Sequence, residues 1–387
     1  MAIYLDYQAS TPLDPRVTAV MLAAMEQSFA NPSSENHSDG WKASSLVETA
    51  RATIASAIAC NPDEIIFTAG ATEADNLGVL GAALGAPDGR RRILIAATEH
   101  KAVIESARAA ERFGFSVEVV PVNHCGLIDI VAFRRLLDES VAVVSIMTVN
   151  NEIGTVQPLH EIVTLSRAAG AFVHTDATQA PCAMDIDVVD WGVDAASFSS
   201  HKIYGPKGIG ALFLSSAAPW RPVPLLFGGG QEQGLRPGTL PTPLCAGFAE
   251  AFAIIAAEGA HERQRVKELR DGFARQLSEQ ILTFQPTVLP PQCHPGNLHA
   301  RFIGIEADDL LARIQPQVSA ATGSACSSGQ IHGSHVLEAI GLSQSEASEG
   351  LRLSIGRFSN VNELAQAVSL IAAAIAEITQ LTQADIS

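Results

Sequence analysis

One short stretch, residues 197–210, constrains the fold of this chain more than any other. Apolar residues lead into two serines, His201 and Lys202, and a glycine-punctuated turn then leads into a second apolar run at residues 211–214. A lysine between two strand-like segments is rarely buried without a function. Its amine can form a Schiff base with an aldehyde cofactor while the neighbouring hydroxyl groups hold a phosphate. A surface loop with a solvated lysine is the alternative for this stretch taken alone.

A glycine turn between a strand and a helix supplies a second phosphate-binding feature. Residues 64–68 are apolar and strand-like, and residues 69–76 form the turn and open a helix. Main-chain N–H groups and the helix dipole bind anions at such a position. The alternative is a capping box, because Thr72 and Asp75 are three residues apart, although one segment can serve both purposes.

Polar side chains also end or follow other apolar runs. His100, Asn151 and Asp176 each come at or soon after the end of such a run. The carboxyl ends of strands are where α/β sheets bind ligands. A buried aspartate is costly unless it is paired, and a protonated pyridine nitrogen is a suitable partner for Asp176. The alternatives are a structural role for His100 and an N-cap role for Asp176.

Strands alternate with helical segments from about residue 60 to residue 215, which predicts an α/β domain with a mainly parallel sheet. A helix over residues 244–275 is expected to carry the chain out of this domain near residue 258. The rest mixes short strands with a final amphipathic helix. We therefore expect a large domain of residues 14–257 and a smaller α+β domain formed by residues 1–13 and 258–387.

Composition restricts the compartment and the partners. The 387 residues carry a formal net charge of −16, which argues against direct nucleic-acid binding through a broad basic face. No signal peptide is expected from the N-terminal residues, and no stretch approaches the ~18 apolar residues of a membrane span. The six cysteines are scattered without a C-x-x-C pair, which fits a reducing cytoplasm and argues against a self-contained metal site.

Taken together, the motifs resemble those of the cysteine desulfurases, pyridoxal-phosphate enzymes of the fold type I, class V aminotransferase group. The similarity covers nearly the whole chain. The motifs that carry it are YLDY at 4–7, NPSS at 31–34, AGATE at 69–73, TEHK at 98–101, VNNEIG at 149–154, HTD at 174–176, SSHKIYGPKG at 199–208, the loop at 228–239, GSAC at 323–326 and LSIGRF at 353–358. The resemblance implies a large domain with a mainly parallel sheet of the seven-stranded type and a smaller α+β domain.

The resemblance also implies a role for each polar residue of these motifs. Lys202 would carry the cofactor, Asp176 would pair with its pyridine nitrogen, and His100 would stack on the ring and assist proton transfers. Gln179 would reach the phenolic oxygen, and Thr239 the phosphate of the partner subunit's cofactor, which implies a homodimer. The residues implied to hold the phosphate are Ala71, Thr72, Ser199 and His201, and those implied to hold the substrate carboxylate are Asn151 and Arg352.

Cys326 decides which reaction the resemblance implies. It lies among small residues at 319–329, a composition typical of a mobile loop, and a catalytic thiol is expected to be accessible. The alternative is a small buried residue. A reactive Cys326 would take sulfur from L-cysteine, leaving L-alanine and a persulfide for a sulfur-acceptor protein. That acceptor could serve iron–sulfur assembly, tRNA thiolation or DNA phosphorothioation.

Two other enzyme classes share this fold. A selenocysteine lyase could use every residue named above, and relative rates on selenocysteine and cysteine separate it from a desulfurase. An aminotransferase has no need of Cys326, and an assay with a keto-acid acceptor would reveal it. A scaffold or regulator on a decayed enzyme fold is disfavoured, because every type of cofactor-contacting residue is present.

Overall fold

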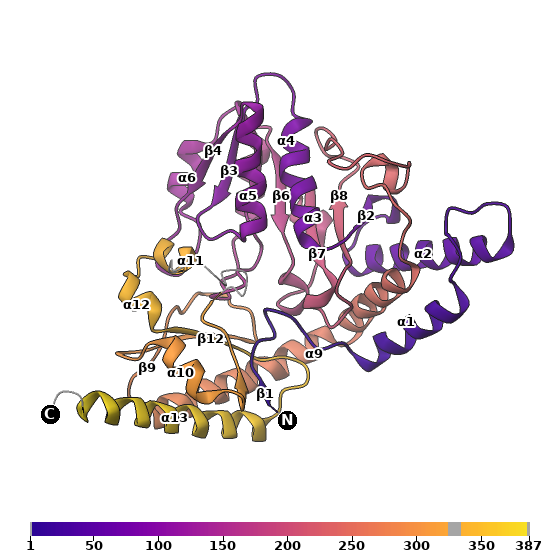
Figure 1. Cartoon of the computed structure of the whole chain (residues 1–387). Helices are drawn as coiled ribbons and strands as arrows, with labels where there is room; N and C mark the ends of the chain where they lie inside the picture. Colours follow the sequence, from indigo (N-terminus) through magenta and orange to yellow (C-terminus); the bar gives the residue numbers. More distant parts are fainter. Residues whose placement is uncertain (1, 324–333, 385–387) are drawn as a thin grey trace.

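The computed structural model describes residues 2–323 and 334–384. A seven-stranded sheet forms the upper part of the molecule in Figure 1. In spatial order its strands are β2 (Ile65–Thr68), β8 (Gly210–Leu214), β7 (Ala195–Ser199), β6 (Phe172–Asp176), β5 (Val141–Ser145), β3 (Arg92–Ala96) and β4 (Ser116–Val120). All neighbours pair in parallel except β8, which is antiparallel to both β2 and β7. The expected α/β class with a mainly parallel sheet is confirmed.

The central strands are short and almost wholly apolar because helices cover both faces of the sheet. In β8, Ala211 and Phe213 pack in one hydrophobic cluster and Leu212 and Leu214 in another, as the period of two requires. One face is covered by α3 (Ala71–Asn76), α4 (Ala82–Leu84) and α5 (Lys101–Ala110). The opposite face is covered by α2 (Ser38–Ala57), α6 (Ile130–Leu136), α7 (Leu159–Ala168), α8 (Val188–Trp191) and the first half of α9 (Thr242–Gln280).

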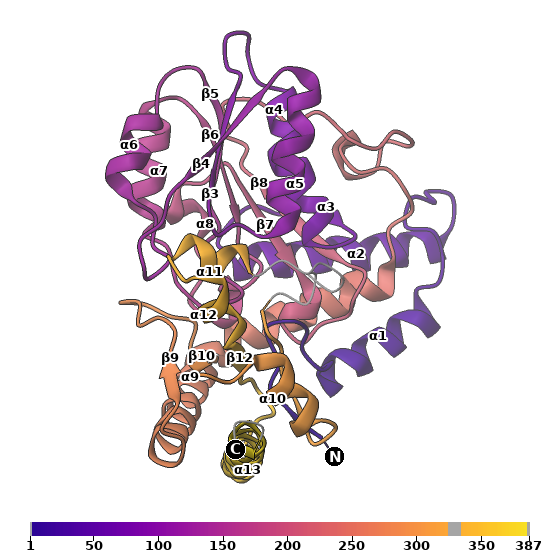
Figure 2. The same ribbon diagram turned by 60° about the vertical axis from the view of Figure 1, so that its left-hand side comes forward.

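A second hydrophobic core lies below the sheet in Figures 1 and 2. It joins a three-stranded antiparallel sheet, a two-stranded parallel pair and several helices. The three-stranded sheet has the order β12 (Gly350–Ser354), β10 (Asn297–Phe302) and β9 (Phe284–Pro286), and the pair is β1 (Ile3–Tyr4) with β11 (Val318–Ser319). The helices of this part are α10 (Ala307–Ile314), α11 (His335–Ala339), α12 (Gln344–Ser348) and α13 (Val361–Ala384).

The long helix α9 belongs to both parts and packs against α1 (Pro15–Gln27) and α2. Its residues up to Ile254 lie in the core beneath the large sheet, and those from Val266 onward lie in the second core. Ile3 and Leu5 from the N-terminus also lie in the second core. We propose that the domain boundary falls inside α9, and this change of packing supports the boundary expected between residues 257 and 258.

Two local expectations were wrong. The helix after residue 70 begins at Ala71 with Gly70 as its N-cap and no side-chain capping bond, so Thr72 and Asp75 form no capping box. By length and composition, α9 and residues Val361–Leu381 of α13 could each cross a membrane, with mean hydropathies of 1.3 and 1.5. The apolar residues of both helices pack into the two cores, which accounts for this composition.

Candidate active site

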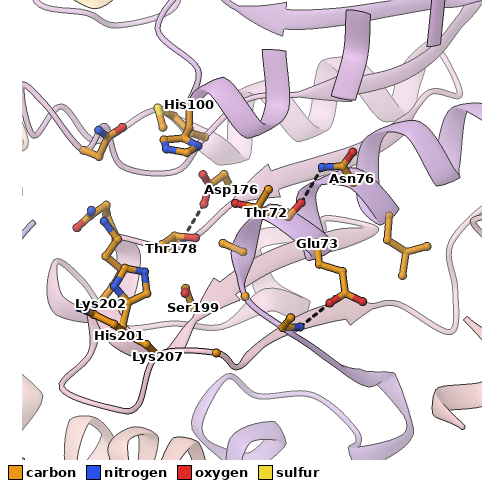
Figure 3. A pocket seen from close by; sticks show the side chains of 18 of the residues that line it. Thr72, Glu73, Asn76, His100, Asp176, Thr178, Ser199, His201, Lys202 and Lys207 are labelled. Carbon is orange, nitrogen blue, oxygen red and sulfur yellow. Dashed lines mark hydrogen bonds between the residues drawn. The ribbon is translucent and has the colours of Figure 1, made fainter. Parts of the chain in front are cut away.

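A cavity of about 830 Å³ lies where the carboxyl ends of β5, β6 and β7 meet the start of α3 (Figure 3). Polar and apolar residues from separate segments converge on it because parallel strands end at one edge of the sheet. The predicted site residues that line it are Ala71, Thr72, His100, Asn151, Asp176, Gln179, Ser199, His201 and Lys202. Thr239 and Arg352 do not line it, and Cys326 lies outside the described residues.

The start of α3 forms one wall of the cavity. Gly70 has a φ of 154°, a conformation that residues with side chains rarely adopt. A Cβ on Gly70 would stand 3.9 Å from Oγ of Ser199, so the glycine leaves that hydroxyl group open to the cavity. Gly210 lets the strand pass close by, since a Cβ there would lie 2.7 Å from Cα of Gly70. The first N–H groups of the helix and the Ser199 hydroxyl group therefore face a common space, which suits an anion.

Asp176 and His100 form the opposite wall (Figure 3). Asp176 ends β6 with 6% of its surface exposed, and its Oδ1 accepts a 2.9 Å hydrogen bond from the N–H of Thr178. His100 is the N-cap of α5, and its Nδ1 accepts a 3.1 Å hydrogen bond from the N–H of Ala102. That bond fixes the tautomer of a neutral ring, leaving Nε2 as the atom that carries the proton.

Lys202 ends a single 3₁₀ turn, Ser200–Lys202, directly after β7. Its Nζ donates a 2.6 Å hydrogen bond to the main-chain oxygen of Gln8, and Nε2 of Gln179 donates a 3.0 Å bond to the same oxygen. Gln8 is itself fixed to the second core, because its N–H donates to Oγ of Ser354 on β12. A single carbonyl group therefore orients both the amine and the amide.

His201 lies beside Lys202 and carries no charge at neutral pH. Burial, with smaller effects from the positive charges of Lys202 and Lys207, lowers the pKa of His201 to about 4. Nδ1 of His201 lies 3.3 Å from Oγ of Ser10. A neutral imidazole can still donate a hydrogen bond to an anion while adding no further positive charge to the two lysines.

Arg352 lies beneath the cavity in β12, with its side chain 1% exposed. Its Nη2 donates a 2.7 Å hydrogen bond to Oδ1 of Asp6, and its Nη1 donates a 2.9 Å bond to the main-chain oxygen of Asn151. The guanidinium group is thus held by an internal carboxylate and reaches the cavity wall through Asn151. Thr239 is exposed on the loop that precedes α9.

The cavity also contains residues that the sequence motifs did not single out. Lys207 and Ser10 line it, and Leu225 and Leu226 add an apolar border. Lys207 stands five residues beyond Lys202 in the same glycine-punctuated stretch, so its position in that motif was the available signal. The N-terminal segment that supplies Ser10 and the Gln8 carbonyl group gave no comparable signal.

The donor set fits an aldehyde cofactor that carries a phosphate and a ring nitrogen. An amine stands at one side of the cavity, helix N–H groups with hydroxyl groups stand at another, and a carboxylate faces both. The other described cysteines are unsuited to this chemistry. Burial raises the pKa of Cys60, Cys182 and Cys245 to about 12, which keeps these thiols protonated.

Comparison with known proteins gives one consistent result. A family model described as aminotransferase class-V matches residues 3–366. The protein named cysteine desulfurase IscS from Rickettsia massiliae (strain Mtu5) is 39% identical over 382 residues, covering 99% of this chain and 93% of that protein. A solved structure titled NifS-like protein superposes with a TM-score of 0.90 at 31% identity, covering 97% of this chain and all of that one.

A second solved structure bears on the ligand. It is titled SspA in complex with cysteine, and it superposes with a TM-score of 0.79 at 34% sequence identity. The match covers 92% of this chain and 99% of that chain.

Proposed function

The chain belongs to the class-V aminotransferase family, and on that premise we propose that it is a pyridoxal-phosphate-dependent cysteine desulfurase. The reaction breaks the carbon–sulfur bond of L-cysteine and forms a sulfur–sulfur bond on the enzyme. The substrate carbon keeps the electron pair and takes a proton, so that L-cysteine and a protein thiol give L-alanine and a protein persulfide. The observation that carries the proposal is the convergence of Lys202, Asp176 and the start of α3 on one cavity.

The phosphate of the cofactor is held at the start of α3. The N–H groups of Ala71 and Thr72, the hydroxyl groups of Thr72 and Ser199, and the neutral ring of His201 face that end of the cavity. Helix N–H groups bind a dianion without having to be desolvated first, because they have no partner within the helix. This part of the site therefore anchors the cofactor and contributes nothing to bond cleavage itself.

Pyridoxal phosphate, when bound, supplies an aldehyde for covalent attachment and a ring that withdraws electrons from the substrate Cα. The negative charge of Asp176 faces the ring nitrogen and keeps it protonated. His100, whose Nδ1 is already bonded to the Ala102 N–H, presents its ring face and Nε2 to the same space. Gln179, held by the Gln8 carbonyl group, presents its amide to the phenolic oxygen.

Lys202 has two tasks. Its Nζ is the covalent attachment point of the cofactor, and once substrate has displaced it, the same amine accepts the proton from the substrate Cα. The hydrogen bond from Nζ to the Gln8 oxygen shows where the amine can be held while it is not attached. A lysine placed this way delivers and removes protons without a second base.

Asn151 and Arg352 hold the substrate carboxylate. The Asn151 side chain lines the cavity, and the Arg352 guanidinium group donates to the Asn151 main-chain oxygen. Arg352 is already paired with Asp6, so a carboxylate would share the guanidinium group with Asp6. Sharing lowers the net attraction for the carboxylate, which suits a substrate that must leave as alanine.

Cys326 is the sulfur acceptor in this proposal. It lies outside the described residues, but Gly323, the last described residue before it, lies against Glu152. A Cβ on Gly323 would lie 3.2 Å from Oε1 of Glu152, which is the neighbour of Asn151 in the cavity wall. The segment that carries Cys326 therefore begins close to the substrate position.

We further infer a cytoplasmic homodimer that passes sulfur to an acceptor protein. The exposed position of Thr239, away from its own cavity, suits contact with the cofactor phosphate of a second subunit. Scattered cysteines suit a reducing compartment. Sedimentation would show a dimer at the concentrations used for assays, and a fully active monomer would contradict the shared site.

The proposed function is tested by supplying the purified protein with pyridoxal phosphate, L-cysteine and a thiol reductant. We expect alanine and sulfide in equal amounts, with no requirement for a keto acid. Formation of a new amino acid from an added keto acid, without sulfide, would identify an aminotransferase instead. A far higher rate on selenocysteine than on cysteine would identify a selenocysteine lyase.

A further inference from the structure

A second carboxylic acid, Asp75, lies behind Asp176 and has no part in the roles assigned above. Asp75 belongs to α3 and is fully buried, whereas Asp176 lines the cavity. A carboxylate oxygen from each, together with a ring nitrogen of His100, lie within 4.8 Å of one another. Two buried carboxylates this close repel each other, so a proton retained by the pair stabilises it.

The titratable groups that face Asp75 do not balance a negative charge on it. From β6, Nε2 of His174 lies 3.7 Å from Oδ1 of Asp75, and from the turn before α5 come His100 and the buried Glu99. Burial lowers the pKa of His174 to about 4, so its ring is neutral at pH 7. Burial, and after it the charge of Asp176, raises the pKa of Asp75 well above its ordinary value.

The position of His174 explains why it stays neutral. Its Nδ1 lies 2.8 Å from Oγ of Ser145 on β5, and its Nε2 lies 2.9 Å from Oγ of Ser197 on β7. Gly78 makes room for the ring, since a Cβ there would lie 2.4 Å from Cδ2 of His174. The imidazole is therefore fitted between two hydroxyl groups, either of which satisfies a neutral nitrogen.

We propose that Asp75 is a positioning residue that stays protonated, so that the pair carries one negative charge, located on Asp176 beside the cavity. The N–H of Thr178, which donates to Oδ1 of Asp176, stabilises the charge there. A single charge matches a single pyridinium, and a second would remain uncompensated in a buried site. The inference rests on the proposed function for the partner of that charge, whereas the protonation of Asp75 needs no cofactor.

Infrared spectroscopy of the cofactor-free protein at pH 7 tests the protonation directly. We expect a carbonyl band of a protonated carboxylic acid that shifts in deuterium oxide and disappears in Asp75→Asn. Asp176→Asn, the matched control, should keep that band. Labelling aspartate with carbon-13 in the unaltered protein gives the same information without a variant. An unchanged band in Asp75→Asn, or one that ignores the aspartate label, would overturn the proposal.

A pH titration of the bound cofactor's visible absorption tests the consequence. Removing a negative charge beside a cation lowers the pKa of that cation. Asp75→Asn should therefore leave the midpoint within about 0.3 pH units of wild type, and Asp176→Asn should lower it by about one unit or more. A downward shift of that size in Asp75→Asn would show that Asp75 is charged. If Asp176→Asn left the midpoint unchanged, the role of Asp176 in the proposed function would fail, while the infrared result would still decide the state of Asp75.

Discussion

The amine of Lys202 and the main-chain oxygen of Gln8 are joined by a hydrogen bond of 2.6 Å. Lys202 follows the central strand β7 of the large sheet, whereas Gln8 is bonded through its N–H to Ser354 in the smaller core. The reactive amine is thus positioned by a contact between the two parts of the molecule. Movement of one part against the other would alter the position of the amine.

We predict that Lys202→Ala abolishes covalent attachment of the cofactor. Borohydride reduction followed by peptide mass spectrometry should find a pyridoxyl group on the Lys202 peptide of the wild-type protein and none in the variant. Lys207→Ala is the matched control because Lys207 lines the same cavity, and it should keep the adduct. A reduced adduct in Lys202→Ala would show that another lysine is the attachment point.

Asp176→Ala should keep the fold and lose cofactor affinity and turnover. Removing one partner of a buried charge pair typically costs ~3–5 kcal/mol, which corresponds to a loss of affinity of two to three orders of magnitude. Equilibrium binding of pyridoxal phosphate and the circular-dichroism spectrum of the variant would be measured together. Undiminished affinity in a folded variant would remove Asp176 from the site.

The sequence motifs were sufficient to predict the strand ends that build the cavity. His100, Asp176, Ser199 and Lys202 follow apolar runs, and the topology of a parallel sheet brings such ends to one edge. The mainly parallel character of the sheet followed from the alternation of strands and helices. The antiparallel position of β8 between β2 and β7 did not, because no local pattern specifies which strands become neighbours.

Contacts between segments far apart in the chain could not be predicted from local pattern. The bond from Lys202 to Gln8 spans 194 residues, and the pairing of Arg352 with Asp6 spans 346. Arg352 was expected to contact substrate as a single donor, but a buried guanidinium group also needs a permanent counter-charge. The closeness of Asp75 to Asp176 is a tertiary effect of the same kind, since Asp75 shows in sequence only as a polar residue early in a helix.

Gly78→Ala should destabilise the protein, whereas Gly272→Ala should not. A Cβ on Gly78 would lie 2.4 Å from the His174 ring, and overpacking of this kind costs about 1–3 kcal/mol. At Gly272, inside α9, the nearest atom would be 3.9 Å away, so alanine should stabilise the helix by roughly 0.5–1 kcal/mol. Denaturant unfolding of both variants measures these changes. Equal stabilities would contradict the packing of Gly78 on His174.

His174 should make the protein less stable in acid. Its folded pKa of about 4 lies below the ordinary value, so the unfolded chain binds more protons and stability falls as pH drops from about 6.5 towards 4. The loss from this histidine amounts to roughly 3 kcal/mol, from about 1.4 kcal/mol per unit of pKa difference. Unfolding free energies at pH 7 and pH 4.5 should differ less in His174→Gln than in wild type.

The matched control for this pH dependence is His124→Gln, in which an exposed histidine is replaced. Its difference between the two pH values should equal that of wild type. If His174→Gln lost as much stability in acid as wild type, His174 would not be a neutral buried group.

The central claim is that sulfur from L-cysteine passes to Cys326. The measurement that tests it most directly is mass spectrometry of peptides from the holoenzyme after a brief exposure to L-cysteine, followed by alkylation. The account predicts one added sulfur atom on the Cys326 peptide and none on the peptides of Cys60, Cys182 and Cys245, whose thiols burial keeps protonated. Cys326→Ser should bind cofactor and cysteine but release almost no alanine, because a hydroxyl group is a far weaker nucleophile. Alanine and sulfide released at the wild-type rate by Cys326→Ser, with no added sulfur on the wild-type Cys326 peptide, would contradict the account.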